Sequence, residues 1–242
     1  MILGCLFIVI FLGGIIFYAA VRPSGKNSVA IETPKLGATN YIEHNANYDI
    51  AVNYASSTPL LSSVGSSANE NAVAVMKKFV SDTVVQFKTD LGLGGVQSDK
   101  KKSLQITYLI GSSYHTVSYI FTIYENTGGA HNNMFFRTFT FNTSTGTSLA
   151  LSDIFVQGDS YLNALSTISR AELPDVIGSG ADTSFINKGT TPEDLNFQNF
   201  FFDNQYLVIL FPPYQVGSYA AGPQTLRIPL SKLSNILKPE YK

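Results

Sequence analysis

Alternating apolar and polar positions predict strands along much of the chain. Residues Asn47 to Tyr54 alternate, as do 104–110 and 116–125, which flank the turn Gly111-Ser112-Ser113. Such a turn between two alternating runs is typical of a β-hairpin. Further strands are expected over 135–141, 200–202 and 205–211.

Helical spacing is clearest between Ser67 and Leu91. Ser67 and Glu70 have the spacing of a capping box, apolar residues then recur every three or four positions, and Gly92 is expected to end the helix. Shorter helices are expected over 161–171, before Pro174, and from Ser231 onward. Because the strands come in hairpins and the helices stand apart, the pattern predicts an α+β fold with a mainly antiparallel sheet and a few packed helices.

The first 21 residues have a different character. Ile2 to Val21 is almost unbroken apolar sequence, long enough to span a bilayer as a helix. Cleavage after Ala20 would place the bulky Tyr18 at a position that signal peptidases need small, so an uncleaved anchor is favoured over a signal peptide. We therefore expect a transmembrane signal anchor over 1–21, a flexible tether over 22–44 and an α+β domain over 45–242.

Charge alone does not fix the orientation of this anchor. Arg22 and Lys26 follow the apolar segment, and taken alone the positive-inside rule would place the domain in the cytoplasm. The family resemblance described below implies the opposite side.

Composition excludes several classes of function. The chain has 242 residues, 45% of them hydrophobic, and a formal net charge of −1, so it has enough apolar sequence for a core and no basic patch for nucleic acid. Its single cysteine, Cys5, rules out an intrachain disulfide and a thiolate metal cluster. We expect no metal and no cofactor.

No catalytic motif is evident, and among the histidines only His131 stands out. The spacing of His44, His115 and His131 does not indicate a metal site. His131 follows Gly128 and Gly129, whose freedom at positive φ suits a close turn between two strands. Three roles remain open for His131: a hydrogen bond that locks the loop, a contact to a ligand, or a catalytic or metal role.

A second candidate site follows the strand 205–211. Pro212 and Pro213 cannot donate to a sheet ladder, so the chain is expected to leave the sheet there. Tyr214 and Tyr219 enter the loop that follows, and Gly222 lets that loop fold closely. Either both rings bind a ligand, or both pack back on the core and only shape the loop.

An ordered set of motifs resembles a known envelope domain. Gly128-Gly129-Ala130-His131 is followed by an aromatic strand, by Thr143-Ser144-Thr145-Gly146 and by Leu149-Ala150-Leu151-Ser152-Asp153-Ile154-Phe155. Farther along come Asn199-Phe200, Phe211-Pro212-Pro213-Tyr214-Gln215-Val216, Tyr219-Ala220-Ala221-Gly222 and Ile228-Pro229. From about Tyr48 to Leu237 the chain resembles the extracytoplasmic domain of RsiV-type anti-sigma factors, which is similar to a region ahead of the catalytic domain in PdaC-type peptidoglycan deacetylases.

The resemblance implies an envelope-facing domain, since in RsiV-type proteins it is a receptor for lysozyme. Such proteins carry a sigma-binding segment before the membrane span, and PdaC-type proteins continue into a deacetylase domain; we see neither here and expect the shared module alone on its anchor. The leading hypothesis is an extracytoplasmic binding module, not an enzyme, whose ligand is a secreted protein such as lysozyme or peptidoglycan. The alternatives are an envelope hydrolase or deacetylase-like enzyme that uses His131 with a carboxylate, and a purely structural envelope protein.

Overall fold

The computed structural model describes residues 40–58, 61, 64–93, 101–113, 115–157 and 160–242, all within a compact unit that spans Ile31–Lys242. The predicted membrane anchor and most of the predicted tether lie outside these residues, so both stay predictions. Within the described part of the chain, no helix has the length and apolar character needed to cross a membrane.

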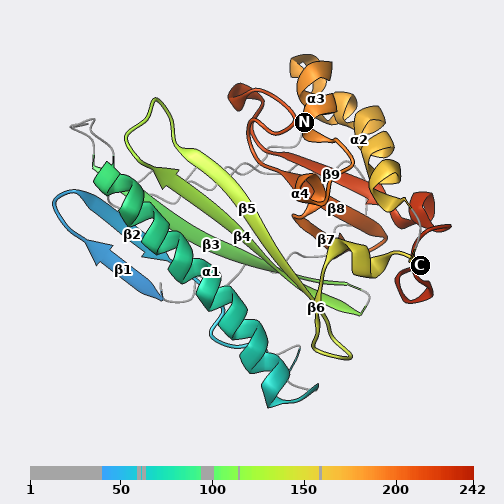
Figure 1. Cartoon of the computed structure of the whole chain (residues 1–242), viewed down its shortest axis with the longest axis horizontal. Helices are drawn as coiled ribbons and strands as arrows, with labels where there is room; N and C mark the ends of the chain where they lie inside the picture. Colours follow the sequence, from blue (N-terminus) through green and yellow to red (C-terminus); the bar gives the residue numbers. More distant parts are fainter. Residues whose placement is uncertain (1–39, 59–60, 62–63, 94–100, 114, 158–159) are drawn as a thin grey trace, which may run out of the picture. The chain divides into compact units, whose positions relative to one another are not determined.

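Strands between Tyr41 and Leu149 form one six-stranded sheet, ordered β1-β2-β3-β4-β5-β6 (Figure 1). The strands are β1 (Tyr41–His44), β2 (Tyr48–Val52), β3 (Lys102–Ser113), β4 (Thr116–Asn126), β5 (Asn133–Asn142) and β6 (Ser148–Leu149). All neighbours are antiparallel except β2 and β3, which are parallel. A long helix joins β2 to β3, and such a crossover connection is what a parallel pair requires. The α+β class is confirmed, with a mixed sheet.

Strand β1 corrects the predicted start of the domain. Residues 41–44 were expected to end the tether, but they pair with β2 in register from Tyr41 opposite Val52 to His44 opposite Asp49. The side-chain oxygen of Asn45 accepts from the backbone N–H groups of Asn47 and Tyr48 at 2.8 and 3.0 Å. This asparagine turn closes a hairpin, and it was the sequence signal that the prediction passed over.

Helix α1 (Ser66–Leu93) covers one face of the six-stranded sheet. The helix contributes Met76, Val80 and Phe87 to the core between them, and the sheet contributes alternate residues of β4, such as Phe121. The predicted helix is confirmed with shifted ends, because it begins at Ser66 and includes Gly92. Ser67 therefore lies inside the first turn and not at the cap.

A second sheet, ordered β7-β8-β9, is formed by the last part of the chain, with β7 (Phe200–Asp203), β8 (Tyr206–Phe211) and β9 (Gln224–Pro229) all antiparallel. Helices α2 (Tyr161–Ile177), α3 (Thr183–Gly189) and α4 (Asp194–Phe197) accompany it. Helix α2 runs through Pro174, where the prediction ended it, and closes at Gly178, which has φ 74°. The expected last helix is instead a 3-10 turn, Leu230–Leu233. Further 3-10 turns are Leu151–Ile154, Gly178–Gly180, Tyr219–Ala221 and Pro239–Tyr241.

The two sheets pack face to face. Val208 and Leu210 of β8 cluster with Ile120 of β4, whereas the alternate residues of β8 belong to a separate core shared with α2. Because Ile120 alternates with residues that face α1, the second sheet covers the opposite face of the first sheet from α1. Threonine side chains join the sheets, since the Thr138 hydroxyl accepts from the Phe200 N–H at 3.0 Å and the Thr140 hydroxyl donates to the Phe200 carbonyl at 3.2 Å.

Candidate functional site

The three residues predicted as ligand contacts lie together, although they come from different parts of the chain. His131 stands in the loop between β4 and β5, and Tyr214 and Tyr219 stand in the connection from β8 to β9. The His131 and Tyr219 rings are stacked, with centroids 3.8 Å apart and planes 17° apart. Nε2 of His131 lies 2.7 Å from the Tyr214 hydroxyl. We call these residues the three-ring surface.

The three-ring surface is open to solvent. Tyr214 is 52% exposed and Tyr219 is 37% exposed, and His131 is also an exposed residue. The alternative in which both tyrosines pack back on the core is therefore wrong. Exposed aromatic rings held in contact with one another offer apolar faces and polar tips to a ligand.

The contacts of His131 favour one tautomer of its neutral ring. Nδ1 of His131 lies 3.3 Å from the carbonyl oxygen of Asn132, which can only accept, so this contact favours the tautomer with the proton on Nδ1. In the neutral ring Nε2 is then an acceptor, and the Tyr214 hydroxyl donates to it. The hydroxyl oxygen of Tyr214 keeps its own lone pairs for a donor on a ligand.

The backbone of Tyr214 is unusual. Its φ is 70°, in the left-handed region that a residue with a Cβ rarely occupies. The turn is closed by the Gln215 N–H, which donates to the Pro212 carbonyl at 3.2 Å. Such strained residues persist only where the surroundings hold them, and they cluster at binding sites.

The Gln215 side chain holds the backbone at Tyr214 in this conformation. Its amide nitrogen donates to the carbonyl oxygens of Gly189 at 3.0 Å and Asn196 at 2.9 Å, which tie the loop to α3 and α4. A Cβ on Gly189 would lie 1.9 Å from the Gln215 carbonyl oxygen, so only glycine allows this approach. The Tyr214 ring is thus presented by a rigid segment.

A second glutamine positions Tyr219. The turn Tyr219–Ala221 is followed by Gly222, which has φ 70° and donates its N–H to the Tyr219 carbonyl at 2.9 Å. The buried side chain of Gln224 donates to the Ala221 carbonyl at 2.6 Å. The predicted need for glycine at Gly222 therefore agrees with its conformation.

The loop that carries His131 is shaped by one of its two glycines. Gly128 has φ 95°, and its N–H donates to the Asn126 side-chain oxygen at 3.0 Å. Gly129 is not among the residues with positive φ. Only Gly128 of the predicted pair thus has a conformation that favours glycine.

The ring of His131 has no acidic partner in the described part of the chain, where its hydrogen bonds go to Tyr214 and Asn132. The other histidines lie elsewhere: Nδ1 of His44 is 2.6 Å from Asp49, and the His115 carbonyl accepts from Thr143. Among the described residues, no three His, Cys, Asp or Glu side chains gather as metal ligands would.

Sequence reasoning missed the residues that position the rings. Gln215 stands in the Phe211–Val216 motif, where its side-chain amide could have been recognised as a group that hydrogen bonds the loop to its surroundings, but no role was predicted for it. Gly189 carries no local signal, because its partner Gln215 belongs to a distant segment of the chain. Gln224 bonds to the carbonyls of Ala221 and Gly222 just before it, and no role was predicted for it either.

Comparisons with known proteins agree with the resemblance seen in the sequence. Residues 152–231 match the model of the family described as protein of unknown function (DUF3298). Over 191 residues the chain is 30% identical to the peptidoglycan-N-acetylmuramic acid deacetylase PdaC of Bacillus subtilis (strain 168). That alignment covers 78% of this chain but 40% of PdaC, so the chain spans about two fifths of the length of this relative.

One solved structure shows the same fold. A DUF3298 family member from Bacteroides fragilis superposes with a TM-score of 0.55 at 19% identity, over 80% of this chain and 86% of that one. A DUF3298 family protein from Pseudomonas aeruginosa PAO1 matches with a TM-score of 0.44 at 17% identity, over 60% and 66% of the two chains. The predicted similarity to PdaC-type proteins is confirmed: the chain carries a domain of the DUF3298/PdaC type.

Proposed function

We propose that the chain is a binding module of the cell envelope and that its three-ring surface holds a glycan strand of peptidoglycan. The observation that carries the proposal is the meeting of His131, Tyr214 and Tyr219, exposed and held from two loops. The name of PdaC supports the choice of ligand, because that relative is a deacetylase of peptidoglycan.

The chemistry of the surface suits a sugar. Aromatic faces pack against the apolar faces of sugar rings, and an exposed amide such as that of Asn132 can hydrogen bond to hydroxyl groups. Gln215 and Gln224 hold the backbone of the loop, and the rings contact one another, so little side-chain entropy is lost when a ligand binds.

The proposed setting is the outer side of a membrane. Residues 1–21 would anchor the chain, and the domain would lie outside the cytoplasm, where peptidoglycan is found. A secreted protein such as lysozyme is the other candidate ligand, because an exposed tyrosine with an apolar body and a polar tip also suits a protein surface. The experiment below separates the two ligands.

The test removes two rings without adding backbone strain. In the full chain, Tyr214→Gly with Tyr219→Ala keeps a residue that tolerates φ 70° at position 214. We expect its affinity for purified peptidoglycan, measured by co-sedimentation, to fall on the order of tenfold or more, as for other aromatic hot spots. The melting temperature should stay close to that of the wild type.

Tyr41→Ala is the matched control, because it removes a tyrosine of similar exposure (38%) from β1. It should sediment with peptidoglycan as the wild type does. Equal binding by the double variant and the wild type would contradict the proposal. If the wild type instead captures lysozyme and leaves peptidoglycan in solution, the site binds a protein and the glycan assignment is wrong.

A further inference from the structure

A second surface lies beside α1, where the helix and the end of the β4–β5 hairpin leave a groove of about 360 Å³. Its walls include two phenyl rings, three carboxylates and an amide, from Phe79, Asp82, Gln86, Asp90, Glu125 and Phe135. In Figure 1, α1 runs obliquely across the sheet and β5 lies to one side of it. The ligand class for such a lining is cationic with an apolar stem.

The charges in the groove are incompletely neutralised by the protein itself. Asp82 is paired with Lys78 at 2.6 Å, whereas Asp90 accepts from the neutral Gln86 side chain at 2.8 Å. In the described part of the chain, neither Asp90 nor Glu125 has an ion pair with a lysine or arginine. Burial raises the pKa of the Glu125 carboxyl, a hydrogen bond with the Asn133 side chain partly offsets that rise, and the negative charge of Asp90 adds to it. A positive group placed between the two carboxylates would relieve this repulsion.

The groove adjoins an open strand edge. Strand β5 pairs with β4 along its length, but β6 covers only Thr140 and Phe141 on its other side. Within the described residues, no backbone hydrogen bond fills that side of β5 over 133–137. Edge strands of this kind accept an extended peptide through their free N–H and C=O groups.

We propose that the groove and the open edge of β5 together form a docking site for an extended, basic peptide segment of a partner protein. The segment adds as a strand beside residues 133–137 and places a lysine or arginine between Asp90 and Glu125. The aliphatic stem of that side chain lies on Phe79 and Phe135.

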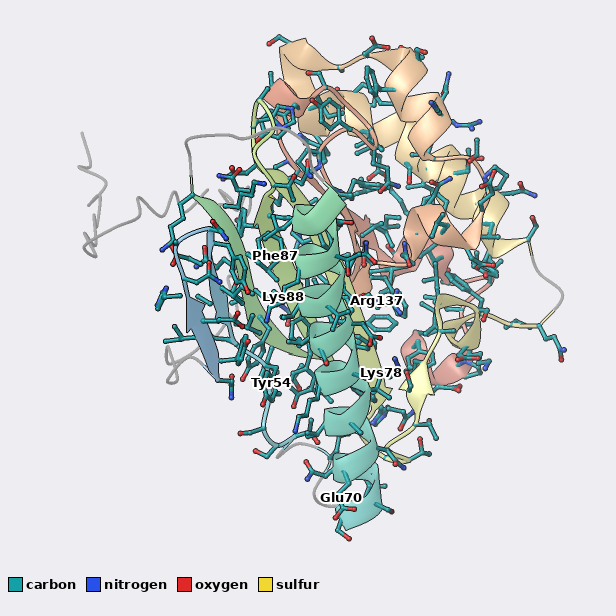
Figure 2. All side chains as sticks on the ribbon, turned by 60° about the vertical axis from the view of Figure 1, so that its left-hand side comes forward. Tyr54, Glu70, Lys78, Phe87, Lys88 and Arg137 are labelled. Atoms are coloured by element: carbon teal, nitrogen blue, oxygen red, sulfur yellow. The ribbon has the colours of Figure 1, made fainter. Side chains whose placement is uncertain are left out.

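Arg137 limits where the basic residue can go. Its guanidinium donates to the Gln198 side chain at 3.0 Å and lies 5.2 Å from the centre of the Phe139 ring. Figure 2 labels Arg137 on the side of α1 away from Lys88. The positive charge of Arg137 repels a basic residue from its end of β5, so the cationic side chain is expected at the Asp90 and Glu125 end.

This site uses other side chains than the three-ring surface. The groove opens on the face of the six-stranded sheet that α1 covers, whereas Tyr214 and Tyr219 stand in the β8–β9 connection of the sheet that packs on the opposite face. The β4–β5 hairpin contributes to both sites, since it carries His131 as well as Glu125 and Phe135. Substitution of Asp90 and Glu125 leaves the three rings in place, so the two sites can be tested with different variants.

The test uses the full chain in detergent micelles and a fluorescently labelled hexapeptide of alternating threonine and lysine. We expect this probe to bind the wild type by fluorescence anisotropy, and Asp90→Asn with Glu125→Gln to weaken binding on the order of tenfold through the lost charge pairing. Asp175→Asn, which removes an exposed carboxylate from α2, should leave the affinity unchanged.

Two further comparisons test the strand and the independence of the site. A peptide with the same lysines but proline in place of the inner threonines cannot complete a ladder, and it should bind more weakly. Tyr214→Gly with Tyr219→Ala should bind the threonine-lysine peptide as the wild type does. The proposal is overturned if the wild type fails to bind this probe, if the charge variant binds it equally well, or if the proline peptide matches it.

Discussion

At the scale of single residues, the two glycines of the β4–β5 loop differ in what they require. Gly128 has φ 95°, whereas a Cβ on Gly129 would find its nearest neighbour, the His131 carbonyl oxygen, at 3.8 Å. Gly128→Val should therefore lose about 1–3 kcal/mol of unfolding free energy through backbone strain. Gly129→Val should change it by less than about 0.5 kcal/mol, as exposed substitutions usually do.

Chemical denaturation of both variants checks this difference, and the unchanged slope with denaturant serves as the control that both unfold in the same manner. Equal losses at the two positions would contradict the assignment of the strain to Gly128. The sequence alone predicted that one or both glycines mattered, because the Gly128-Gly129 pattern does not reveal which φ is positive.

Tyr214 shows the same limit of sequence reasoning more sharply. Two prolines and a nearby glycine indicated that the chain leaves the sheet, and the structure confirms that it does, since β8 ends at Phe211. Nothing local indicated that Tyr214 itself takes φ 70° or that its hydroxyl reaches His131 at 2.7 Å. That contact joins residues 83 positions apart, and only the packing of the two sheets brings them together.

At the scale of elements, an ion pair of Lys88 connects β1 to α1. Nζ of Lys88 lies 2.6 Å from the Glu43 carboxylate, which also accepts from the hydroxyls of Tyr41 and Tyr48. Figure 2 labels Lys88 on the side of α1 nearest β1. The Lys88 ammonium, followed by the two hydroxyls, lowers the pKa of Glu43 from 4.5 to about 2. Strand β1, which lies at the end of the predicted tether, is thus held by charge as well as by its ladder.

The ion pair between Lys88 and Glu43 should make the stability of the domain depend on pH. Because the pKa of Glu43 is lower in the folded chain, the carboxylate stabilises the fold fully above pH 4.5, and that contribution is lost as the pH falls toward about 2. Lys88→Met removes the largest cause of the shift. We expect its melting temperature to lie below that of the wild type near neutral pH, and the gap to narrow between pH 4.5 and about 2.

Lys78→Met is the matched control for Lys88→Met, because Lys78 pairs with Asp82 on the same helix and does not touch Glu43. Its effect should not follow the Glu43 titration. A carboxyl titration by NMR that finds Glu43 at an ordinary pKa in the wild type would remove the basis of the prediction.

Elements with strong periodicity were predictable, and their ends were not. The alternation of β3 and β4 and the stripe of α1 reflect burial on one face, which leaves a direct pattern in the sequence. The end of α2 was misplaced because Pro174 was expected to stop the helix, whereas Gly178 does so one turn later. Strand β1 was missed because its burial is slight, with Ile42 55% exposed, so no buried face marks it.

At the scale of the whole described unit, two cores meet across one small cluster. The core under α1 and the core under α2 contain different residues, and Ile120, Val208 and Leu210 join them. Which face of the first sheet the second covers depends on contacts between distant segments, such as Thr138 with Phe200. Sequence periodicity predicts which residues share a face of each sheet, but it does not predict what packs on that face. The three residues of the three-ring surface could therefore be predicted one by one, but their contact with one another could not.

The position of the domain relative to the membrane is the prediction with the widest consequences. If residues 2–21 anchor the chain and the domain lies outside the cytoplasm, alkaline phosphatase fused after Lys242 should be active, because that enzyme needs export to form its disulfides. Deletion of residues 2–21 is the matched control, and it should abolish the phosphatase activity while leaving a cytoplasmic reporter fused at the same place active. The opposite pattern in the intact chain would follow the positive-inside preference of Arg22 and Lys26. A cytoplasmic domain would not meet peptidoglycan, so that result would overturn the proposed function. The proposed peptide site beside α1 would be unaffected, because it requires only a basic partner.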